Sequence, residues 1–83
     1  MITAGFEAQA AAYEAALAKA KAALPGLIAE REAAEAAWAE RGGAVRMWNA
    51  REAVGRHEKL LAQLRREVET HRLLADLVAG RRL

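Results

Sequence analysis

The sequence predicts an all-α protein that folds as an antiparallel helical hairpin with coiled-coil-like heptad packing. The composition favours this fold, because alanine, leucine, glutamate, arginine and lysine dominate and are strong helix formers. Apolar residues also recur every seven positions in both halves of the chain. Two adjacent glycines, Gly42 and Gly43, separate these halves. At 83 residues, we expect one domain, residues 1–83.

The first helix is predicted over about residues 3–41. Two rows of residues spaced by seven would share one face of this helix, and their alanines would let a facing helix approach closely. The rows are Ala10, Leu17, Leu24, Arg31 and Trp38, and Phe6, Tyr13, Ala20, Leu27 and Ala34. Trp38 falls on this face close to the predicted turn, where we expect it to anchor the core.

The segment around Pro25 and Gly26 allows two structures. A proline inside a helix removes one backbone hydrogen bond and clashes with the preceding turn, and it disfavours helical angles at the residue before it. The first helix is therefore either kinked at residues 25–26 or broken there into two helices with a corner. The rows keep their register across Pro25, which favours the kink, whereas residue propensity favours the corner.

The turn is predicted at residues 42–43, because glycine commonly follows the last residue of a helix. The second helix is predicted over about residues 44–79, followed by a basic tail at 80–83. Its rows are Met47, Val54, Leu61, Val68 and Ala75, and Ala50, His57, Leu64, His71 and Val78. A short connection between two such helices makes an antiparallel hairpin.

Several large apolar side chains of the second helix widen its apolar face or lie outside it. One facing helix cannot cover a face of this breadth. We therefore expect the hairpin to form part of a larger helical bundle, either by self-association as a dimer or by binding a larger protein. The candidate interface residues are Trp48, Leu60, Leu73, Leu74 and Leu77.

The two histidines, His57 and His71, lie on one row of the second helix. They are two heptads apart, roughly 21 Å along a helix, so they cannot share a metal ion within one chain. The Glu-x-x-His spacing typical of di-metal bundles is also absent. We expect these polar residues to set the register or the oligomeric state, and we predict no metal or other cofactor.

The chain offers little for catalysis. It has no cysteine and no serine, and no glycine-rich phosphate loop, and a helical hairpin provides no deep cleft. We therefore predict no enzymatic activity and no small-molecule substrate. Since no stretch approaches the roughly 18 apolar residues of a membrane span and no secretory signal is visible, we expect a cytoplasmic protein without a membrane partner.

Charge is divided unevenly between the two halves. Residues 1–43 carry four Lys or Arg against six Glu, and residues 44–83 carry nine Lys or Arg against five acidic residues. The favoured function is a non-catalytic protein-interaction module, such as a small chaperone, adaptor, inhibitor or assembly component of a bacterial or phage system. The alternative is a small nucleic-acid-associated protein that uses the arginine-rich second helix. Its candidate contacts are Arg65, Arg66, Arg81 and Arg82.

Overall fold

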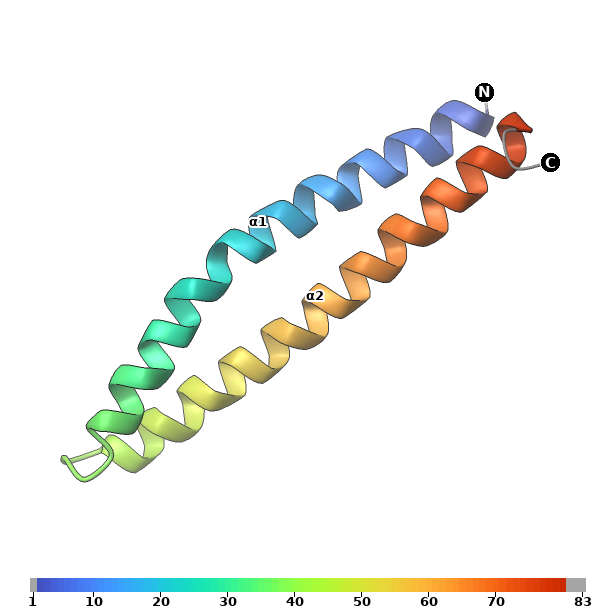
Figure 1. The fold of residues 1–83 in the computed structure, drawn as a ribbon. Coiled ribbons are helices and arrows are strands. Elements are labelled where there is room, and N and C mark those ends of the chain that lie inside the picture. Colours follow the sequence, from blue (N-terminus) through green and yellow to red (C-terminus); the bar gives the residue numbers. More distant parts are fainter. Residues whose placement is uncertain (1, 81–83) are drawn as a thin grey trace.

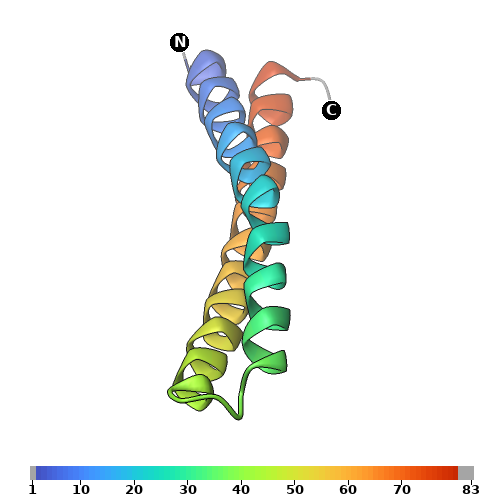
Figure 2. The same ribbon diagram turned by 90° about the vertical axis from the view of Figure 1, so that its left-hand side faces the viewer.

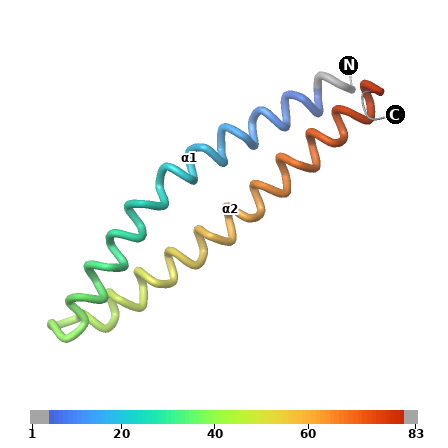
Figure 3. The backbone as a smooth tube through the Cα atoms, viewed as in Figure 1, coloured from blue at the N-terminus to red at the C-terminus, as the bar shows by residue number. Residues whose placement is uncertain are grey.

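The computed structural model describes residues 2–80, with side chains from residue 5 onward, and consists of two helices. Helix α1 spans Ile2–Ala36 and helix α2 spans Gly43–Ala79. The helices lie side by side and antiparallel (Figure 1), and they cross at a shallow angle (Figure 2). The molecule is a rod of 60 × 16 × 15 Å, with the turn at one end (Figure 3). The predicted all-α hairpin is therefore confirmed for the described residues.

Helix α1 passes through Pro25 as one continuous element. The corner at residues 25–26 that residue propensity favoured is therefore wrong. Helix α1 as a whole is rich in alanine, and this high helix propensity together with packing against α2 offsets the lost backbone hydrogen bond. The ribbon of α1 follows a gentle curve over its length (Figure 1).

The end of α1 differs from the prediction. The helix ends at Ala36 instead of about residue 41, and the turn occupies residues 37–42 instead of 42–43. Successive backbone hydrogen bonds close this turn, from Glu40 N–H to the Ala37 carbonyl at 3.0 Å and from Gly43 N–H to the Glu40 carbonyl at 2.8 Å. The connection is thus a compact, hydrogen-bonded loop.

The two glycines have different tasks in this loop. Gly42 lies at the N-cap of α2 with φ of 74°, a left-handed conformation that costs other residues energy. Gly43 is buried as the first residue of α2, and a Cβ there would collide with the backbone carbonyl groups of Ala37 and Trp38. Gly42 therefore allows the reversal, and Gly43 allows the two chain segments to touch.

The early end of α1 also moves Trp38 out of the helix. Trp38 lies in the turn and is 60% exposed. The prediction that it anchors the core is therefore wrong, because its place on the apolar face depended on helical geometry continuing to residue 41.

The contact between the helices is built mostly from small side chains. All the buried apolar side chains belong to the rows expected to face the other helix. They are Ala10, Ala20, Ala34, Ala50, Val54, Leu61 and Ala75. The larger row residues, such as Tyr13 and Leu64, are half-buried at the edges of this contact. The hairpin therefore has a narrow core and much apolar surface beside it.

Helix α2 ends as the sequence indicated, at Ala79. Gly80 follows with φ of 77°, and its N–H donates to the carbonyl groups of Asp76 and Leu77. This left-handed glycine satisfies carbonyl groups that a helix end otherwise leaves open.

Candidate interaction surfaces

Three grooves lie in a row between the helices along one side of the hairpin, which we call the furrow face. Their α1 residues include Gln9, Ala16, Ala23 and Glu30, which are seven residues apart and so share one edge of the helix. Their α2 residues include Arg46, Ala53 and Leu60, which are also seven apart. The three grooves therefore form one track along the hairpin.

The central groove of this track is apolar. It has a volume of about 370 Å³. Its lining residues are Ala16, Lys19, Ala20, Ala23, His57, Leu60 and Leu64. Leu60 is 42% exposed although it forms one wall. Alanines thus line the α1 side and leucines the α2 side, with Lys19 at the rim.

The opposite side of the hairpin, the ion-pair face, is charged. Arg51 donates to the Glu35 carboxylate at 2.8 Å, and Arg72 forms an ion pair with Glu14. Glu35 also receives Arg31 from its own helix at 3.4 Å. Hydrogen bonding from Arg51 lowers the pKa of the Glu35 carboxyl. The acidic α1 and the basic α2 therefore pair with each other along this face.

A further ion pair joins the helices on the furrow face near the turn. Arg46 donates from Nε and Nη2 to the two carboxylate oxygens of Glu30, at 3.0 and 2.9 Å. This two-pronged contact lowers the pKa of Glu30 and raises that of Arg46. Both side chains are about half-exposed, so solvent screens their attraction.

The predicted register-setting histidines lie between the helices and bond differently. His57 Nε2 donates to the Ala20 carbonyl of α1 at 2.6 Å. His71 Nδ1 donates to the Glu67 carbonyl of its own helix at 2.8 Å, and its ring lies 5.0 Å from that of Tyr13. Of the two histidines, only His57 thus links the two helices through a hydrogen bond. No group of three potential metal ligands gathers within the described residues.

The candidate interface residues do not form one surface. Leu60 and Leu74 are two heptads apart and Leu77 lies one turn further, so these three follow the furrow side of α2. Leu73 lies one turn before Leu77 but about 100° round the helix from Leu74, which places it further from the furrow. Trp48, which is 63% exposed, lies one turn before Arg51, towards the ion-pair face. Trp48 therefore lies apart from the four leucines, and Leu73 is the leucine furthest from the furrow.

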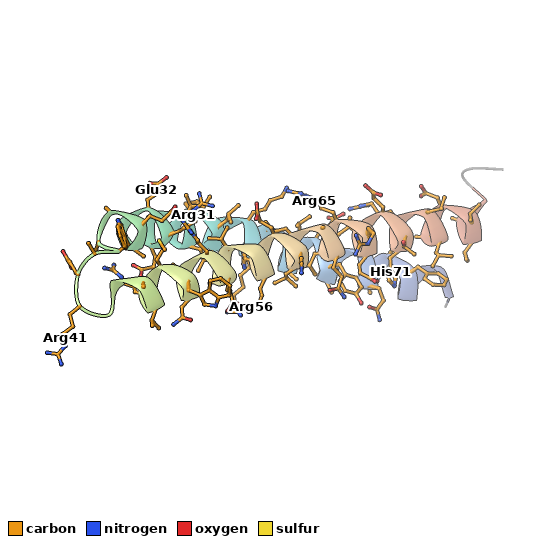
Figure 4. All side chains as sticks on the ribbon, turned by 90° about the horizontal axis from the view of Figure 1, so that it is seen from below. Arg31, Glu32, Arg41, Arg56, Arg65 and His71 are labelled. Carbon is orange, nitrogen blue, oxygen red and sulfur yellow. The ribbon has the colours of Figure 1, made fainter. Side chains whose placement is uncertain are left out.

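The region around the turn holds exposed apolar groups that the sequence analysis did not propose. Besides Trp48, the side chains of Trp38 and Val45 are more than half exposed. Val45 precedes Trp48 by three residues, which places them on neighbouring positions of one helix face. The three-residue spacing of Val45 and Trp48 was the sequence signal that could have indicated this exposed apolar surface. Arg41 projects from the turn away from both helices (Figure 4).

The arginines of the nucleic-acid alternative are only partly described. Arg65 and Arg66 are exposed, whereas Arg81 and Arg82 lie outside the described residues. Arg65 shares its row with Arg51 and Arg72, and Figure 4 shows it on the edge of α2 opposite Arg56. As neighbours in a helix, Arg65 and Arg66 point in directions about 100° apart.

Neither helix, over the residues described, is long and apolar enough to cross a membrane. Comparison with protein-family models, with curated proteins and with solved structures found no match for this chain.

Proposed function

We propose that this chain is a non-catalytic helical protein-interaction module. The observation that carries the proposal is the surface left uncovered, 5970 Å². A folded monomer of 9.0 kDa is expected to expose about 4,900 Å². The excess of about 1,100 Å² is comparable to the roughly 800 Å² that each partner buries in a standard interface. The proposal thus accounts for the uncovered surface as an interface that a partner completes.

The kind of surface exposed supports the same proposal. Leu60, Leu77 and Trp48 are each more than 40% exposed, whereas the side chains between the helices are mostly alanines. Full burial of a leucine is worth roughly 1.5–3 kcal/mol, so a partner that covered these residues would stabilise the hairpin considerably. Exposed apolar surface of this extent is typical of interaction sites.

The finer architecture belongs to this proposal. We propose that the helices pack by coiled-coil-like heptads, with α1 kinked at Pro25, and that the hairpin joins a larger bundle formed with a second copy or a larger protein. The burial of the row residues and the Glu30–Arg46 and Glu35–Arg51 pairs beside them support heptad packing. Roles as a small chaperone, adaptor, inhibitor or assembly component, in the cytoplasm, are consistent with such a module.

The proposal is tested by analytical ultracentrifugation at micromolar concentration together with affinity capture from the native host. Leu60→Glu or Leu74→Glu should dissociate an assembly or abolish partner capture. Glu32→Gln should do neither, because Glu32 is exposed on α1 and points away from α2 (Figure 4). A monomer that melts cooperatively at high temperature and captures nothing would overturn the proposal.

Nucleic-acid binding is the second candidate. It is favoured by the exposure of Arg65 and Arg66, neither of which takes part in the ion pairs found among residues 5–80. Affinity for nucleic acid should then fall steeply between low and physiological salt. Gel-shift assays with Arg65→Gln and Arg66→Gln, at two salt concentrations, separate this candidate from a protein-binding module.

A further inference from the structure

We infer that the furrow face binds one amphipathic helix with an acidic edge, supplied by another protein, which completes a three-helix bundle. This inference rests on the proposed interaction function and names the partner. The site is the central groove, with the grooves on either side of it as the continuing track. From Gln9 to Glu30 the track runs roughly 32 Å, the length of a helix of about 21 residues.

The walls of the groove favour a helix as the occupant. The α1 wall carries Ala16 and Ala23, whose small side chains let a neighbouring backbone approach closely, while Leu60 and Leu64 of α2 offer larger apolar contacts. Both walls are helices, whose backbone groups bond along the helix axis, so neither offers the open edge that an added strand needs. A helix with an apolar stripe can cover both walls at once.

The charges beside the central groove are basic. Lys19 lines it, and no ion pair of Lys19 occurs within the described part of the chain. Arg56 lies one turn before Leu60 and points to the side opposite Arg65 (Figure 4); its contact with Glu52 is long, at 3.7 Å, and exposed. An incoming helix therefore finds positive charge on both sides of the groove, which acidic side chains complement.

The carboxylates nearest to the track lie towards its two ends and have polar partners there. Glu30 receives both hydrogen bonds from Arg46 near the turn. Glu67 lies 3.6 Å from the His71 ring towards the other end. The middle of the track therefore keeps its basic character over the length between these two groups.

The same charges disfavour a second copy in this groove. Lys19 and Arg56 are the sequence neighbours of Ala20 and His57, which are hydrogen-bonded to each other, so they lie at one height along the hairpin. A two-fold axis through the centre of the groove would place these two cations against the same two of the other copy. Like charges brought together oppose such pairing. An acidic partner avoids this repulsion.

Two synthetic peptides of 21 residues serve as probes. Both carry leucines at heptad a and d positions, one has glutamates and the other lysines at the flanking positions, and binding to the full chain is measured by fluorescence anisotropy. We expect the glutamate peptide to bind about tenfold more tightly, with the difference shrinking at high salt because exposed charges are screened.

Matched variants locate the binding site. Lys19→Glu should weaken binding of the glutamate peptide about fivefold and strengthen binding of the lysine peptide. Lys21→Glu is the control, because Lys21 is also exposed on α1 but lies about 200° further round the helix. Ala16→Gln should obstruct the groove and weaken both peptides, whereas Ala15→Gln, on another side of the helix, should leave both unchanged. Circular dichroism verifies that each variant is folded.

The outcomes separate this inference from the proposed function. Equal binding of both peptides, or equal effects of Lys19→Glu and Lys21→Glu, overturns the acidic-helix inference. A dimer that Leu60→Glu dissociates overturns it as well, in favour of a second copy, while the interaction function stands. If neither peptide binds and the protein is a partnerless monomer with a cooperative melt, both fail.

Discussion

Two adjacent leucines on α2 provide a sharp test of the narrow core. Leu61 is 4% exposed and is the largest of the buried side chains, whereas Leu60 beside it is 42% exposed. Leu61→Ala removes apolar contact and leaves a cavity, a change that costs 2–5 kcal/mol in well-packed cores. We expect about 2–3 kcal/mol here, because the surrounding alanines form a thin layer that can close partly around the gap. Leu60→Ala, at a half-exposed position, should cost about 1 kcal/mol or less.

Thermal melts followed by circular dichroism measure the difference. In a domain of this size, 1 kcal/mol shifts the melting temperature by about 4–8 °C. Leu61→Ala should therefore lower it by roughly 10–20 °C, and Leu60→Ala by about 5 °C. Equal losses at a concentration where ultracentrifugation shows a monomer would refute the reasoning. Equal losses that appear only at high concentration would mean that an assembly covers Leu60.

Three further predictions follow from the backbone and the ion pairs. Pro25→Ala should raise the free energy of unfolding by about 1–3 kcal/mol in urea titrations, because a continuous helix regains a backbone hydrogen bond, and a loss of stability would contradict this. Gly43→Ala should destabilise the hairpin by about 2 kcal/mol or more through the clash with the Ala37 and Trp38 carbonyl groups, while Gly26→Ala, in open space within α1, should stabilise it by about 0.5–1 kcal/mol in the same titrations. The pKa of Glu30 lies below its ordinary value of 4.5 because Arg46 hydrogen-bonds to the carboxylate, so this pair stabilises the fold above that pH and its contribution is lost as the pH falls through the lower folded value. Melts from about pH 5 to about pH 3 should therefore show a smaller loss for Glu30→Gln than for the unchanged protein, and identical losses would exclude this role.

The helices and their contact faces could be predicted because the spacing of apolar residues along the sequence determines both. Val54, Leu61 and Ala75 recur at multiples of seven residues, which places their side chains on one face of α2, and burial follows from that spacing. The end of α1 could not be predicted in the same way. Residues 37–41 include alanine, glutamate and arginine, which favour helix, so nothing local marks the end. The close approach of Gly43 to the carbonyl groups of Ala37 and Trp38 is a tertiary contact, and it explains why Trp38 is exposed.

The candidate surface was predictable in part. The spacing of Leu60, Leu74 and Leu77 indicated one side of the second helix. The residues of α1 that share this side depend on how the helices align, which the hydrogen bond between His57 and Ala20 reveals. The position of Lys19 beside the groove follows only from that alignment. The sequence does not give this alignment of α1 against α2, which is known only once both helices are placed in space.

The hairpin geometry has a consequence for how the protein opens and closes. Near the turn, segments in contact are a few residues apart in sequence, whereas the Phe6–His71 ring contact, at 6.5 Å, closes a loop of about 65 residues. Closing a long loop costs more chain entropy than closing a short one. Contacts between the helices should therefore form first near the turn during folding, and they should break first at the far end. Amide hydrogens of α1 should exchange progressively faster from the turn towards Phe6. The partner helix that we propose would then meet a furrow that is rigid near the turn and loosens with distance from it.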